Sequence, residues 1–138
     1  MDNNILFETK YWNIFLNENQ AYLGYSIIVL KRECKTLSEV NNEEWIDFHE
    51  KVVKTLETTF KEKFGATMFN WTCLMNDAYK KTEPNPLVHW HFRPRYNLDV
   101  FIGKEKFKDP NFAHHYDKHA KKIVSRDIIT KIITRFNK

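Results

Sequence analysis

The segment from residue 42 to residue 64 constrains the fold of this chain more than any other. Its large apolar residues recur at three- and four-residue spacing, which places them in one stripe along a helix: Trp45, Phe48, Val52, Leu56, Phe60 and Phe64. Asn41 or Asn42 can cap the start of this helix, and Gly65 can end it. The spacing therefore predicts a long amphipathic helix over 42–64.

The remaining apolar segments predict an antiparallel sheet. Residues 10–16 and 22–31 are typical of two strands joined by a polar turn, and the second is apolar on both faces, as a central strand is. The other expected elements are strands over 68–75, 88–96 and 99–102 and a last helix over 118–136. Because strands come in adjacent pairs and helices are set apart, the fold class is α+β.

Length and composition predict one domain in a reducing compartment. The chain has 138 residues with only 3 Gly and 4 Pro, which leaves little room for flexible linkers. No apolar run approaches the ~20 residues of a membrane span, and we see no signal peptide. Cys34 and Cys73 make no disulfide framework, so we expect a cytoplasmic location.

The net charge of +4 is unevenly distributed. Residues 104–138 hold ten Lys and Arg against four Asp and Glu, whereas residues 1–103 hold 12 against 14. The basic excess therefore belongs to the C-terminal quarter. It is either the solvated side of a tail helix or a binding surface for an anionic ligand.

The segment 87–96 contains the most informative pattern. Side chains alternate between the two faces of a strand, so Val88, Trp90 and Phe92 point into a core. The opposite face then carries two imidazoles and two guanidiniums, from His89, His91, Arg93 and Arg95. Such a face favours a small phosphate ligand over a nucleic-acid polymer.

Three interpretations of this face remain open from the residues alone. A neutral histidine can attack phosphorus while a second imidazole stabilises charge or manages a proton. Alternatively, the face is a solvated sheet surface with paired histidines. A zinc site is the third interpretation, although no Cys-x-x-Cys or His-x-x-x-His pair accompanies His89 and His91.

The same segment resembles the signature strand of the histidine-triad (HIT) superfamily, His-φ-His-φ-His-φ-φ, where φ is apolar. The three triad positions are Leu87, His89 and His91 here. The order of the preceding hairpin, crossing loop, long helix and strand is also similar, so the resemblance covers roughly residues 10–102 and extends to 109–116. It implies a HIT-like fold in which the antiparallel sheet carries one long helix and a C-terminal helical extension.

The resemblance implies an activity and its residues. His89 would be the nucleophile that attacks an α-phosphate and becomes nucleotidyl-histidine, and His91 would contact the phosphate oxygens. Asn76 would bind phosphate and Asn17 the ribose, while the base would lie between apolar residues of the first hairpin, such as Ile14 and Ile27 or Leu16. We expect Arg93 and Arg95 to bind substrate as well, and no metal or other cofactor. The substrate would be a dinucleoside polyphosphate or a nucleoside phosphoramidate.

Three positions depart from the superfamily pattern. Leu87 replaces the first histidine and can neither donate nor accept a hydrogen bond through its side chain. Tyr25 stands where relatives have a histidine after the hairpin glycine. The small phosphate loop is replaced by residues 82–85, which include a proline. These departures favour an alternative: a nucleotide-binding protein with little or no catalysis.

The C-terminal part carries further expectations. By resemblance, residues 1–107 form the nucleotide-binding core and 108–138 an extension of the same domain, and two copies pair as a homodimer. The segment 114–119 is expected to fold back over the His89/His91 face. We interpret the histidines of this region as surface or capping residues: His114, His115 and His119.

Overall fold

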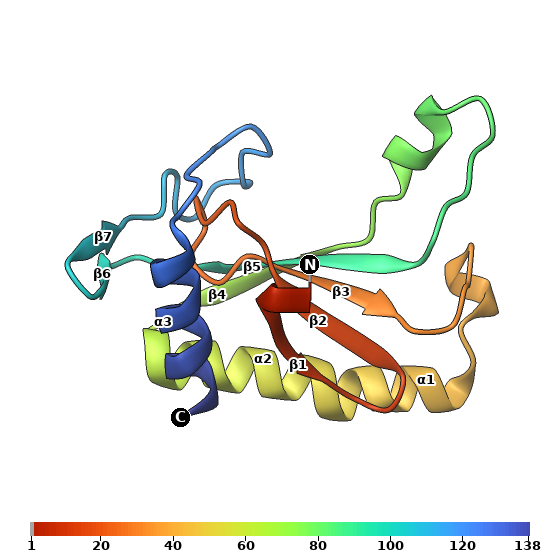
Figure 1. Ribbon diagram of the computed structural model, residues 1–138, viewed down its shortest axis with the longest axis horizontal. Helices are drawn as coiled ribbons and strands as arrows, with labels where there is room; N and C mark the ends of the chain where they lie inside the picture. Colours follow the sequence, from red (N-terminus) through yellow and green to blue (C-terminus); the bar gives the residue numbers. More distant parts are fainter. Residues whose placement is uncertain (1) are drawn as a thin grey trace.

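The computed structural model describes residues 2–138. A five-stranded sheet, a long helix and a C-terminal helix form its framework (Figure 1). The strands are β1 (Ile5–Glu8), β2 (Trp12–Leu16), β3 (Ser26–Leu30), β4 (Met68–Thr72), β5 (His89–Arg95), β6 (Val100–Ile102) and β7 (Glu105–Phe107). The helices are α1 (Asn42–Asp47), α2 (Lys54–Thr59) and α3 (Arg126–Asn137), with short 3₁₀ turns at Asp2–Asn4, Leu37–Glu39 and Asn76–Lys80.

The sheet has the order β1-β2-β3-β5-β4, with each neighbouring pair antiparallel. β3 therefore lies in the middle, as its two apolar faces predict. A separate hairpin pairs β6 with β7. The predicted α+β class with an antiparallel sheet is confirmed.

One continuous helix covers one face of the sheet. α1 and α2 belong to it, joined by a π-helical stretch at Phe48–Val53 and followed by another at Phe60–Phe64, so the helix spans 42–64 as predicted. Asn41 caps its start by accepting a hydrogen bond from the backbone N–H of Glu44 (2.9 Å). Gly65 ends it in the left-handed conformation.

Aromatic side chains join this helix to the sheet. The rings of Phe48 and Trp90 lie 5.3 Å apart and those of Phe60 and Phe92 lie 5.9 Å apart, measured between centroids. Trp90 and Phe92 are alternate residues of β5, so their burial against the helix turns the intervening residues of β5 to the opposite face. Two irregular segments, 73–88 and 108–125, rise on that opposite side (Figure 1).

The C-terminal helix begins later than predicted. The periodicity of the tail predicts a helix from residue 118, but α3 begins at Arg126, capped by the Ser125 hydroxyl. Residues 122–124 are instead held in extended form against the β2–β3 loop. The backbone N–H of Gln20 donates to Lys122 O (2.8 Å), and that of Val124 donates to Glu18 O (3.1 Å). These bonds remove the segment from the helix.

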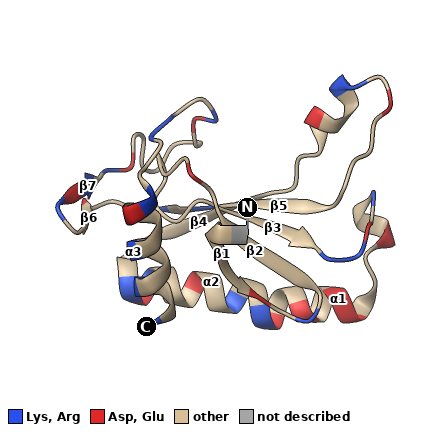
Figure 2. Cartoon of the chain, in the orientation of Figure 1, with Lys and Arg blue, Asp and Glu red and all other residues tan. Residues whose placement is uncertain are grey.

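α3 packs on the same core as the sheet and the long helix. The Phe136 ring lies 5.3 Å from that of Phe60 and 5.6 Å from that of Phe7, between centroids. The basic residues of 104–138 are spread over the β6–β7 hairpin, the irregular segment and α3 (Figure 2). Across the described residues, no helix combines the length and the apolar character needed to cross a membrane.

A close approach at Gly24 fixes the hairpin against the long helix. Its φ is +94°, and a Cβ added there would lie 2.5 Å from Cε1 of Phe60, a fully buried ring. We expect Gly24→Ala to lower the free energy of unfolding by about 3 kcal/mol or more, since strain and overpacking add. Chemical denaturation measures the loss.

Gly65 provides the matched control for this substitution. Its φ is also positive, +85°, but an added Cβ would meet nothing within 4 Å. Gly65→Ala should therefore cost only about 1 kcal/mol, the backbone contribution alone. Equal losses in the two variants would show that contact with Phe60 does not restrict position 24.

Candidate functional site

β5 presents four chemically active residues on the face of the sheet opposite the long helix. Each has a partner on β3, on β4 or on both. His89 is aligned with Val29, His91 with Ile27 and Thr72, Arg93 with Asn70, and Arg95 with Met68. The two histidine rings lie 5.0 Å apart between centroids and meet edge to face. The alternation thus brings the predicted histidines together, half-buried, at the open end of the strand.

Leu87 orients His89 through its backbone. Nδ1 of His89 lies 2.8 Å from Leu87 O. A carbonyl oxygen only accepts, so Nδ1 carries the proton and, in the neutral ring, Nε2 keeps a free lone pair. A histidine side chain at position 87 is therefore not needed to fix the tautomer of His89.

Tyr25 holds His91. The Tyr25 hydroxyl lies 2.7 Å from Nδ1 of His91. Burial, the neighbouring His89 and the Arg93 guanidinium lower the pKa of His91 from 6.5 to about 4, while Asp77 opposes the shift. His91 is therefore neutral near pH 7. Burial also raises the pKa of Tyr25, so its hydroxyl stays protonated.

The depressed pKa of His91 gives a testable pH dependence. An unfolded histidine takes up a proton near pH 6.5, whereas folded His91 stays neutral down to about pH 4. The unfolded state therefore binds more protons between these values, and His91 makes stability fall as the pH drops from about 6.5 to about 4. NMR titration of the His91 ring should give the low midpoint.

The variant His91→Gln isolates this contribution from those of other titrating groups. Its free energy of unfolding should depend less steeply on pH between about 6.5 and 4 than that of the parent chain. Parallel pH profiles for the two chains, or a His91 midpoint near 6.5, would contradict the assignment.

Arg93 is held between two tyrosine rings. Its guanidinium carbon lies 4.1 Å from the centroid of Tyr25 and 4.0 Å from that of Tyr116, and only 8% of the residue is exposed. Within the described part of the chain it forms no ion pair. Its positive charge therefore acts on the neighbouring groups, as the lowered pKa of His91 indicates.

Arg95 has a structural role, which differs from the substrate-binding role expected from the sequence. It is fully buried and pairs with Asp109, with Nε 2.7 Å from Oδ2 and Nη2 3.0 Å from Oδ1. The other N–H groups donate to the Asn70 side chain and to the carbonyls of Asn111 and His114. All five donors are thus used within the protein, and none is left for a ligand.

The C-terminal segment covers the arginine end of β5 rather than the histidine end. Residues 109–117 are tied to Arg95 and to the Tyr22 hydroxyl, which donates to Asn111 Oδ1 (2.8 Å) and accepts from the backbone N–H of Asp117 (2.7 Å). The expected fold-back therefore stops at Arg93. The histidines of this region are exposed: His114, His115 and His119.

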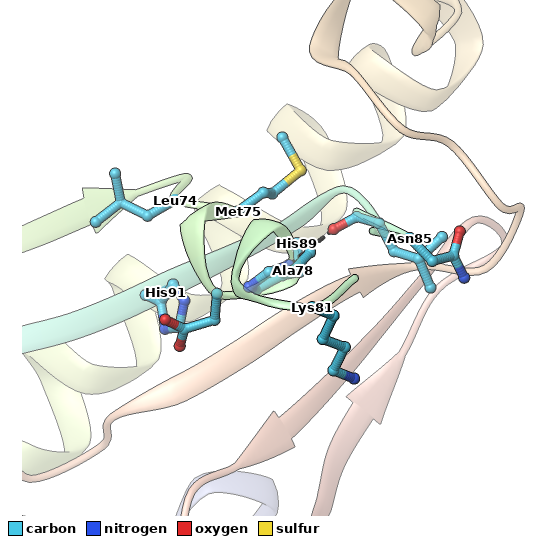
Figure 3. A pocket seen from close by; sticks show the side chains of 9 residues that line it. Leu74, Met75, Ala78, Lys81, Asn85, His89 and His91 are labelled. Atoms are coloured by element: carbon cyan, nitrogen blue, oxygen red, sulfur yellow. Dashed lines mark hydrogen bonds between the residues drawn. The ribbon is translucent and has the colours of Figure 1, made fainter. Parts of the chain in front are cut away.

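A pocket of about 330 Å³ opens at the histidine end (Figure 3). It is bounded by the pair of histidines on β5 and by the β4–β5 loop. Its lining consists of Leu74, Met75, Asp77, Ala78, Lys81, Asn85, Leu87, His89 and His91. Asn76, predicted to bind phosphate, is exposed and does not line this pocket, whereas its neighbour Asp77 does.

The predicted nucleoside-binding residues are only partly placed on this face. Ile14 and Leu16 are buried on the opposite side, toward the long helix, so they are not available to a base on the histidine face. Ile27 lies beside His91, and Phe15 is its partner on β2. Because side chains alternate between the two faces of β2, the buried residues Trp12, Ile14 and Leu16 leave Phe15 on the histidine face. Asn17 lies at the end of β2, and its Oδ1 accepts from the backbone N–H of Asn19 (2.8 Å).

Other residues near the site belong to no motif or periodic pattern in the sequence. Asp77 and Lys81 belong to an irregular loop, and Tyr116 reaches Arg93 from a distant segment. Among residues 2–138, no three or more His, Cys, Asp or Glu side chains gather in a way that could hold a metal ion.

Comparison of the sequence finds no matching family model and no matching curated protein. Comparison of the fold finds solved structures. A histidine triad protein from Marinobacter aquaeolei superposes with a TM-score of 0.71 at 18% identity, covering 95% of this chain and 83% of that one. The diadenosine triphosphate hydrolase of Plasmodium falciparum gives 0.61 at 16% identity, covering 99% and 76%.

The NitFhit protein of C. elegans gives a TM-score of 0.62 at 16% identity; the match covers 98% of this chain but only 27% of NitFhit. At such identities the likeness establishes the fold, which is HIT-like. Proteins with this fold include nucleotide hydrolases and transferases.

Proposed function

We propose that this chain is a nucleotide hydrolase or transferase that cleaves at the α-phosphate of a dinucleoside polyphosphate or a nucleoside phosphoramidate. The observation that carries the proposal is the histidine pair in the pocket of a HIT-like fold. His89 has its Nδ1 proton held by Leu87 O and its Nε2 free. A neutral imidazole with a free Nε2 lone pair can attack phosphorus.

The reaction would proceed in two displacements. Nε2 of His89 attacks the α-phosphorus, and the bond from phosphorus to the leaving group breaks with its electron pair. A phosphate leaving group departs as an anion, whereas an amine also takes up a proton from the solvent that reaches the open pocket. Water then attacks the phosphorus of nucleotidyl-His89, and the bond from phosphorus to Nε2 breaks with its electron pair returning to Nε2. A proton of the water passes to solvent, and the nucleoside monophosphate is released.

The residues around His89 support both steps. Neutral His91, if it accepts the Tyr25 proton at Nδ1, carries Nε2–H and can donate to a phosphate oxygen. The cation of Arg93 lies behind Tyr25 and favours the extra negative charge of the transition state. We assign the nucleoside to the neighbouring surface of Phe15 and Ile27, with Asn17 toward the ribose and Asn76 at the mouth of the site.

Two departures from the superfamily pattern are compensated by other atoms. The lost side chain at position 87 is replaced in its orienting role by the backbone carbonyl of Leu87. Tyr25 supplies a hydroxyl to His91 where relatives would supply an imidazole. Both compensations favour catalysis over simple binding.

The test is incubation of the purified chain with an adenylate phosphoramidate and with a dinucleoside tetraphosphate, in a buffer containing a chelator. We expect release of nucleoside monophosphate from at least one of them, because the proposed route uses His89 and water and requires no metal ion. Absence of that product from both substrates would overturn the proposal.

A second candidate function is nucleotide binding with little turnover. It is favoured by Leu87 and by Pro84 and Pro86 in the loop, which lack the backbone N–H groups that a phosphate loop offers. Calorimetry with a nucleoside monophosphate, combined with the restoring substitution Leu87→His, separates the two. Rapid turnover that Leu87→His leaves unchanged would exclude the binding-only function.

A further inference from the structure

The pocket lacks the fixed positive charge that the sequence of β5 predicts. His91 is neutral, because burial and its charged neighbours lower its pKa to about 4. Arg95 is committed to Asp109, and Arg93 is enclosed by two tyrosine rings. Neither arginine lines the pocket, so a phosphate there needs another cation for direct contact, beyond the more distant charge of Arg93.

Lys81 of the β4–β5 loop brings a positive charge to the lining of this pocket. Of the nine residues that line the pocket, it is the one lysine or arginine, and Figure 3 shows its long side chain extending from the loop at the edge of the pocket. The acid in the same lining, Asp77, is paired with Lys80, since its Oδ1 lies 2.9 Å from Nζ of that lysine. This contact also lowers the pKa of Asp77. Within the described part of the chain Lys81 forms no ion pair of its own.

We propose that Lys81 binds the phosphates beyond the α-phosphate, so that the site selects anionic polyphosphate leaving groups over amines. This inference rests on the proposed function, because the proposed function places the α-phosphate at His89. The loop side of the pocket is then the space left for the rest of the substrate. A lysine is a mobile point charge suited to a flexible phosphate chain.

Calorimetry with ATP and with AMP tests this without requiring turnover. The chain should bind ATP more tightly than AMP. Lys81→Gln should weaken ATP binding about fivefold to tenfold, as expected for the loss of a charge-assisted contact at a partly exposed site, and AMP binding less than about twofold. Lys104→Gln removes the same charge from the distant β6–β7 turn and should change neither affinity.

Kinetics separate this inference from the proposed function. If turnover occurs, Lys81→Gln should raise the KM for the dinucleoside tetraphosphate. The KM for the phosphoramidate should not change. Equal losses for ATP and AMP, no loss for either, or no ATP binding by the parent chain would overturn the role of Lys81. A selective loss of ATP affinity in a chain without turnover would support Lys81 and contradict the hydrolase.

Discussion

The substitution His89→Ala should reduce turnover by at least about a thousandfold. Removal of a nucleophile eliminates the covalent route and leaves only the contribution of binding and charge stabilisation. Nucleotide affinity should change far less, because His91 and Lys81 remain in the pocket. Steady-state kinetics and calorimetry on the same preparations measure the two effects.

A matched control for this variant is His49→Ala. His49 is an exposed histidine on the long helix, so its removal should leave turnover unchanged. Rapid quenching followed by mass spectrometry should also detect a nucleotidyl adduct on the peptide that contains His89. Equal turnover by His89→Ala and the parent chain would refute the assignment of the nucleophile.

The substitution Arg95→Met should have the largest effect on stability. It leaves Asp109 buried without its partner and removes donors from Asn70 and from two carbonyls of the segment 109–117. Breaking a buried pair in this way costs about 3–5 kcal/mol. Burial opposes ionisation of Asp109 and the Arg95 hydrogen bonds lower its pKa, so Arg95→Met removes the side chain that favours the charged carboxylate.

Lys31→Met is the comparison for Arg95→Met. The Lys31–Glu8 pair is as short, 2.8 Å, but both side chains are solvent-accessible. Its loss should cost less than about 1 kcal/mol. Chemical denaturation of the two variants measures both losses of stability. A similar small cost for both would mean that Arg95 does not anchor the C-terminal segment.

Periodicity predicted the parts of this fold in which local pattern and tertiary packing agree. The long helix has both an apolar stripe and caps at its two ends, and its bounds agree with 42–64. The alternation of β5 likewise predicted which side chains share a face, because Trp90 and Phe92 pack on that helix. Where pattern and packing disagreed, the tertiary contacts prevailed.

The disagreements have identifiable causes. α3 begins at Arg126 because the backbone around Lys122 pairs with the β2–β3 loop, a contact with residues a hundred positions away. The role of Arg95 depends on Asp109, which lies in an irregular segment without periodicity. Ile14 and Leu16 were assigned to a base-binding surface, although strict alternation with Trp12 places them in the core.

The backbone contact to His89 has a consequence for sequence variation. Every amino acid carries a main-chain carbonyl, so the atom that fixes the histidine ring is independent of the side chain at position 87. Selection at this position then acts on shape and polarity at the pocket wall, which Leu87 helps to line. A search pattern that demands a third imidazole would pass over chains in which the main chain performs the same task.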